Sequence, residues 1–93
     1  MTRPEMLKFL QENCRELLGK ECSHVNERYE ITKIGLDAVE CLEVVKAFEQ
    51  RLRMSIPDDF LSGLQTVGQL LDVVEKCDRN RDYWAPERLA ATP

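Results

Sequence analysis

Residues 35–52 read GLDAVECLEVVKAFEQRL and predict the central helix of a small helical protein. Asp37 is a favourable N-cap, because its carboxylate can accept a hydrogen bond from the first helical turn. Apolar residues then recur at mostly helical spacing, and charged residues largely occupy the rest of the helical wheel. The apolar set is Val39, Leu42, Val45, Phe48 and Leu52. We expect the helix to end near Arg53, since Pro57 disfavours helical backbone at the residue before it.

The same periodicity predicts a helix on either side of this stretch. The first spans residues 3–18, with Pro4 near its start and Gly19 as its stop. Its apolar face consists of Met6, Leu7, Leu10, Cys14, Leu17 and Leu18. The last helix begins at Thr66 as N-cap. Its apolar face consists of Val67, Leu70, Leu71, Val73 and Val74.

The connecting segments lack sustained periodicity. Residues 19–36 are interpreted as a long loop, and loops of that length are usually functional. Isolated apolar side chains are expected to pin this loop across the helices: Val25, Tyr29, Ile31 and Ile34. Residues 58–64 suggest one short helical turn broken by Gly63. Residues 78–93 are mostly polar, contain two prolines and are interpreted as a tail. The sequence as a whole shows neither a strand pattern nor an internal repeat.

Length and charge narrow the possible functions. Ninety-three residues suffice for one domain, which we place at residues 1–77. The net charge of −4 argues against nucleic-acid binding, which needs a basic face, and favours partners with basic surfaces. No apolar segment resembles a membrane span or a signal peptide, so we expect a cytoplasmic protein that is monomeric on its own.

Four cysteines occur without a C-x-x-C pair, at positions 14, 22, 41 and 77. A metal site is therefore not predicted, and reduced thiols fit the cytosol. Cys14 and Cys41 lie among apolar positions at helical spacing and are interpreted as small buried hydrophobic residues. No nucleophile–base pair, metal cluster or phosphate-binding loop is apparent, so we do not expect an enzyme.

Three short motifs in order resemble the acyl carrier protein family. They are GLDAVE at residues 35–40, LEVV at 42–45 and IPDD at 56–59, followed by Thr66-Val67 at the start of the last helix. The family pattern is G-x-D-S-L, an acidic and apolar helix, I-P-D and a T-V pair. The resemblance covers about residues 4–77. It implies an all-α, four-helix acyl-carrier-like bundle of three main helices and one short helix, with a long loop between the first and second.

The resemblance also implies a prosthetic group that this chain has no atom to hold. In the family, the serine beside the N-cap carries 4′-phosphopantetheine, whose thiol binds acyl groups as thioesters in fatty-acid or polyketide synthesis. Here Ala38 takes the place of that serine and Val39 that of the following leucine, next to Asp37. Lys33 stands where the family usually has an acidic residue. The group is expected only on a serine form, and we interpret Ala38 as an engineered replacement for serine.

The family's second helix is its recognition helix. The resemblance therefore implies that Glu40, Glu43 and Glu49 meet basic patches on phosphopantetheinyl transferase, ketosynthase and other synthase enzymes. Val39 and Val44 are expected to supply apolar contact, and Lys46 to tune partner choice. Phe60 and Leu64 either line a groove for an acyl chain or belong to the core.

Two other functions stay open from the sequence. If Ala38 is natural, the chain is a degenerate carrier-like adaptor that only binds partners. A peptidyl or aryl carrier protein has the same arm, although its second helix is typically less acidic.

Overall fold

Each α-helix begins at a capping box, in which the N-cap side chain and the third helical residue bond each other's backbone N–H. The helices are α1 (Arg3–Leu18), α2 (Ala38–Leu52) and α3 (Val67–Arg79), and their N-caps are Thr2, Asp37 and Thr66. The predicted N-cap roles of Asp37 and Thr66 are confirmed. These starts are encoded locally, and each cap stabilises its helix by about 0.5–2 kcal/mol.

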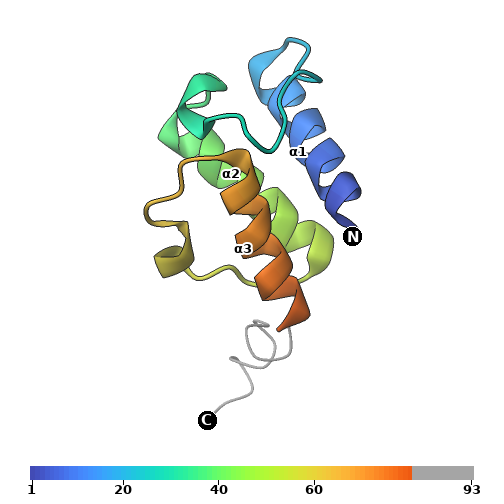
Figure 1. Cartoon of the computed structure of the whole chain (residues 1–93), viewed down its shortest axis with the longest axis vertical. Helices are drawn as coiled ribbons and strands as arrows, with labels where there is room; N and C mark the ends of the chain where they lie inside the picture. Colours follow the sequence, from blue (N-terminus) through green and yellow to red (C-terminus); the bar gives the residue numbers. More distant parts are fainter. Residues whose placement is uncertain (81–93) are drawn as a thin grey trace.

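The computed structural model describes residues 1–80. Besides the three α-helices it contains two 3₁₀ turns, η1 (Ile31–Lys33) and η2 (Asp58–Leu61). Among these residues the one β-type pairing is an isolated antiparallel bridge between Glu30 and Thr66. The predicted all-α class is confirmed, although the short fourth helix is only a 3₁₀ turn. Helix α1 packs against both α2 and α3, and η2 lies beside α3 (Figure 1).

The two longest helices end in left-handed backbone. Gly19 follows α1 with φ 67°, a conformation that costs glycine little because it has no Cβ. Arg53 follows α2 with φ 52°, which strains a residue that has a side chain. Helix α3 runs to Arg79, two residues past the domain boundary at residue 77 expected from the sequence. Residues 81–93 of the expected tail lie outside the described residues.

One core lies between the three helices and the long loop. Its fully buried members come from the three α-helices and the long loop and include Met6, Leu10, Val25, Phe48, Val67, Leu71 and Val74. The rings of Phe9 and Phe48 meet edge to face with centroids 4.9 Å apart, which joins α1 to α2. Of the four apolar side chains expected to pin the loop, Val25 and Ile34 are buried and Tyr29 and Ile31 are half-buried.

The long loop is tied to the start of α3 by backbone hydrogen bonds. Ile31 N–H donates to the Gln65 carbonyl, Val67 N–H to that of Tyr29 and Gly68 N–H to that of Glu27, over 2.8–3.0 Å. The first N–H groups of a helix have no partner within the helix, so the loop satisfies two of them here. A Cβ at Gly68 would lie 3.0 Å from the Glu27 carbonyl oxygen, and this close approach favours glycine.

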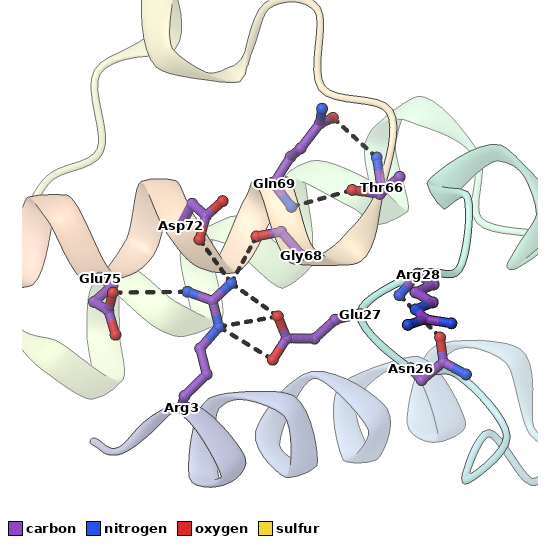
Figure 2. A network of polar contacts seen from close by, with 9 residues as sticks. All are labelled: Arg3, Asn26, Glu27, Arg28, Thr66, Gly68, Gln69, Asp72 and Glu75. Atoms are coloured by element: carbon purple, nitrogen blue, oxygen red, sulfur yellow. Dashed lines mark hydrogen bonds and ion pairs between the residues drawn. The ribbon is translucent and has the colours of Figure 1, made fainter.

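Arg3 reinforces the same junction from α1 (Figure 2). Its Nη2 donates to Glu27 Oε1 at 2.9 Å, to the Gly68 carbonyl at 2.9 Å and to Asp72 Oδ1 at 2.7 Å. Its Nε contacts both Glu27 carboxylate oxygens at 3.2 Å, and Nη1 lies 3.8 Å from Glu75 Oε1. The hydrogen bond to Glu27 is the main reason that the pKa of Arg3 is raised. One guanidinium thus links α1, the loop and α3.

Candidate functional site

Position 38 is the first residue of α2, and Ala38 is exposed there. Asp37 Oδ1 accepts a hydrogen bond from Glu40 N–H at 2.7 Å, and Glu40 Oε1 accepts one from Asp37 N–H at 3.0 Å. This capping box fixes the backbone on both sides of residue 38. A side chain at this position therefore projects from a rigid helix start, where the helix dipole favours negative charge.

An apolar cavity of about 380 Å³ begins beside this position. Ala38, Cys41 and Leu42 line it near the start of α2, and the rest of its lining comes from further along α2 and from the other elements of the bundle. Those residues are Leu10, Cys14, Ile31, Ile34, Leu36, Val44, Val45, Leu61, Leu64, Val67 and Leu70. The cavity has about thirteen times the volume that one molecule occupies in liquid water, ~30 Å³, so it exceeds an ordinary packing defect. Its chemistry suits an aliphatic chain.

Two of the glutamates that were expected to bind partners make hydrogen bonds within the chain. Glu40 belongs to the capping box of α2, and Glu49 Oε2 accepts a hydrogen bond from Ile56 N–H at 2.8 Å. Both side chains are half-buried, whereas Glu43 and Lys46 are exposed. Glu49 therefore holds the turn after α2, and Glu43 is the acid that α2 presents most freely. The sequence alone did not separate these roles, because the partner of Glu49 lies beyond the helix.

The expected apolar contacts need one correction. Val44 is only 2% exposed and belongs to the core, so the folded chain does not offer it as a surface contact. Leu42, which the helical pattern placed in the core stripe, is 48% exposed, and Val39 is 64% exposed. The buried side of α2 is centred on Val44, Val45 and Phe48, which leaves Leu42 at its edge and Val39 outside. Val39 and Leu42 thus form an exposed apolar patch next to Ala38.

Of the two residues expected either at a groove or in the core, one lines the cavity. Leu64 lines the cavity, together with Leu61, whereas Phe60 does not. The Phe60 ring instead lies 5.0 Å from Lys76 Nζ, a cation–π distance on the side of η2 that faces α3. Sequence periodicity missed Leu61, because a 3₁₀ turn has a different repeat from an α-helix.

Within residues 1–80, no group of three or more potential metal ligands is found, and none of the helices is long and apolar enough to cross a membrane. All four cysteines are free thiols. Burial raises the pKa of Cys14 to about 11 and also raises that of Cys77.

Comparison with known proteins finds that this chain is similar in sequence and in fold to acyl carrier proteins. The chain is 33% identical over 76 residues to the acyl carrier protein of Exiguobacterium sibiricum, covering 81% of this chain and 96% of that protein. It is 30% identical over 91 residues to the meromycolate extension acyl carrier protein of Mycolicibacterium smegmatis, covering 97% and 88%. The acyl carrier protein of Thermotoga maritima superposes with a TM-score of 0.71 at 27% identity, over 80% of this chain and 87% of that one. No family model matches.

The relatives above are carrier proteins and not enzymes, and the fold of this chain matches that of a solved member of the group. With the relatives above, the chain belongs to the acyl carrier protein family.

Proposed function

We propose that this chain is a carrier protein of fatty-acid or polyketide-type synthesis. Its carrier domain is residues 1–77, and position 38 is the point at which the family's prosthetic group is attached. One observation carries the proposal: Ala38 is exposed at the capped start of α2 and also lines the apolar cavity. A group attached here would reach solvent and partners on one side and the cavity on the other. The expected setting is the cytoplasm, with the chain as a monomer between encounters.

The residue now at position 38 does not fit the family's prosthetic group. The alanine methyl has no oxygen with which to form a phosphodiester, so 4′-phosphopantetheine cannot be attached here. When present, that group supplies the thiol that holds acyl chains as thioesters. We infer an engineered replacement of serine, because the surrounding Asp37–Glu40 capping box is intact. A natural alanine would instead favour an adaptor that only binds partners, and the codon in the encoding gene separates the two.

Restoring the hydroxyl tests the attachment point. We expect Ala38→Ser, incubated with a promiscuous phosphopantetheinyl transferase, coenzyme A and Mg²⁺, to gain the mass of one phosphopantetheine by intact-mass spectrometry. The unchanged chain is the matched control, because it keeps Ser23, Ser55 and Ser62 and should gain nothing. A serine variant that stays unmodified, while an established acyl carrier protein is modified in the same reaction, would contradict the proposal.

The exposed face of α2 is the proposed docking surface for partners with basic patches, such as the transferase and a ketosynthase. It combines the apolar side chains of Val39 and Leu42 with the charges of Glu43 and Lys46. Single exposed ion pairs contribute only about 0–1 kcal/mol, so the charges serve mainly to steer and orient the partner. Fast release then follows, as a protein that passes between several enzymes requires.

Charge reversal on this face tests the docking surface. We expect Glu43→Lys to weaken binding of the transferase by about tenfold at low salt, because one attraction becomes a repulsion. Glu16→Lys on α1 is the matched control, since Glu16 is also exposed and the change in net charge is the same. Isothermal titration should show the gap between the two variants shrinking as salt is added. Equal affinities at low salt would remove Glu43 from the interface.

A further inference from the structure

The long loop between α1 and α2 is bounded by two glycines in left-handed backbone. Gly19 has φ 67° and Gly35 has φ 101°, and at neither residue does a non-adjacent atom lie within 4 Å of the point that a Cβ would occupy. Hinges are a few positions in loops or at the ends of elements that absorb large changes in backbone angle. Glycine makes such changes at little steric cost. Residues 20–34, which we call the strap, therefore lie between two points that can act as hinges.

The strap holds its own shape through short-range hydrogen bonds. Four of its backbone N–H groups donate to the carbonyl three residues earlier, over 3.0–3.2 Å: Val25 to Cys22, Tyr29 to Asn26, Lys33 to Glu30 and Ile34 to Ile31. The Arg28 N–H also donates to Asn26 Oδ1 at 2.9 Å. Both partners of each bond belong to the strap. The strap can therefore move as one piece without breaking them.

The strap is attached to α1 and α3 mainly by polar contacts. Gln11 Nε2 of α1 donates to the Val25 carbonyl at 2.6 Å. At α3, the three backbone hydrogen bonds described above use the N–H groups of Ile31, Val67 and Gly68. The N–H groups of the first helical turn have no acceptor within their own helix. The strap can therefore leave α3 without any loss of hydrogen bonds inside that helix.

Arg3 is the side chain that joins the strap to both helices at once. From α1 it contacts the Glu27 carboxylate of the strap through Nε and Nη2, and the same Nη2 donates to the Gly68 carbonyl and to Asp72 of α3 (Figure 2). These groups are not sealed from water, since the Glu27 and Asp72 side chains are both more than one-third exposed. The contact can therefore break and re-form while the helices stay packed.

Apolar side chains of the strap close the core and one wall of the cavity. Cys22 and Val25 are buried in the core, and Ile31 and Ile34 line the apolar cavity. Exposing these side chains to water costs free energy, so the strap is closed most of the time. Its opening would uncover the core beside α1 and would open the cavity along the wall that Ile31 and Ile34 form.

We propose that the strap detaches from α1 and α3 as one unit while the three helices stay folded, and that Arg3 is the latch that sets how often this occurs. Proteins open locally in cooperative units whose opening free energies are smaller than that of global unfolding. The strap has the features of such a unit: internal hydrogen bonds, a glycine at each end and an attachment that is partly open to water. The proposal does not depend on position 38 or on a prosthetic group.

Amide hydrogen exchange of the unchanged full-length chain, followed by NMR at low urea concentrations, tests the proposal. The N–H groups of Ile31, Val67 and Gly68 should give one common opening free energy that depends little on urea, because the opening exposes little surface. Amides in the middle of the helices, such as those of Leu10 and Phe48, should be more strongly protected. Their opening free energy should fall steeply with urea, because they exchange through global unfolding.

Two variants separate the latch from a general loss of stability. Arg3→Ala should speed exchange at the three N–H groups of the strap attachment by about 30-fold. Val74→Ala is the matched control, because it leaves a void in the buried face of α3 away from the strap attachment. It should speed exchange at Leu10 and Phe48 but not at the strap attachment. Glu27→Gln removes the charged partner of Arg3 and provides a second test if Arg3→Ala unfolds.

Alkylation of Cys22 by iodoacetamide reports the same opening from a side chain. Cys22 is a free thiol and is only 2% exposed, so it should react only when the strap opens, and Arg3→Ala should speed its reaction by the same factor. Peptide mapping by mass spectrometry identifies the modified residue.

Three results would overturn the proposal. Equal urea dependence at the strap attachment and in the helices would show that only global unfolding occurs. A Cys22 thiol that stays protected while the N–H groups of Val67 and Gly68 exchange would show that only the start of α3 frays. Unchanged exchange at the strap attachment in both Arg3→Ala and Glu27→Gln would show that Arg3 is not the latch.

Discussion

Replacing Arg3 by alanine removes the side chain that joins α1, the long loop and α3. The Arg3 side chain is 25% exposed, and that of its bidentate partner Glu27 is 40% exposed. A hydrogen bond to a charged group contributes about 1.5–3 kcal/mol when it is shielded, whereas the pair with Asp72, 69% exposed, adds about 0–1 kcal/mol. After allowance for solvent screening at Glu27, we expect Arg3→Ala to lower the free energy of unfolding by about 2 kcal/mol. For a domain of this size the melting temperature should fall by roughly 8–16 °C.

Urea and thermal unfolding followed by far-UV circular dichroism would measure this loss. Arg3→Lys is the matched control, because it keeps the charge but cannot form the two-pronged contact with Glu27, and about half of the loss should remain. A double-mutant cycle with Glu27→Gln isolates the coupling of the pair from other effects. A loss below ~0.5 kcal/mol for Arg3→Ala, the range of ordinary surface substitutions, would refute the reasoning. So would a cycle that shows no coupling between the two residues.

Two further predictions concern the ends of the helices. Arg53→Gly should raise the free energy of unfolding by about 0.5–1 kcal/mol, because glycine adopts the left-handed backbone at this position without strain. Urea titrations would measure this change, and an unchanged or lower free energy of unfolding would contradict the prediction. Hydrogen bonds from Thr2 lower the pKa of Glu5 from 4.5, so its contribution to the start of α1 is present above that value and is lost as the pH falls through the lowered pKa. NMR Cα shifts of residues 3–6 should therefore lose helical character on acidification in the unchanged chain but much less in Glu5→Gln, and identical titrations of the two would contradict the assignment.

The sequence predicted those parts of the fold that short-range interactions determine. Asp37 and Thr66 were identified as helix starts because each meets its partner within three residues. Gly19 was identified as the end of α1 because glycine adopts left-handed backbone readily. Such signals depend on a few neighbouring residues, so no knowledge of the packing is needed.

The sequence did not predict what long-range packing determines. Leu42 and Val44 both sit on a helix that was predicted with its correct limits, but their exposure depends on the directions from which α1 and α3 approach. Arg3 and Asp72 are 69 residues apart, and no local pattern signals their contact. At the candidate site, the family motif indicated position 38, whereas the place of Cys41 on the cavity wall required the assembled bundle.

Because hydrogen bonds join the long loop to the start of α3, one part of the cavity wall is held in place more strongly than another. Ile31 lies on the stretch of wall that is held by the backbone bonds to residues 65–68 and by Arg3. Leu61 and Leu64 lie on the segment 58–64, which the Phe60–Lys76 contact joins to α3. All four residues of η2 are at least partly exposed, and its N-cap is a proline, whose side chain has no hydrogen-bonding group. A guest too long for the resting volume would therefore make room by displacing residues 58–64. Substitutions in η2 should thus change the length of guest that is tolerated without altering the rest of the bundle.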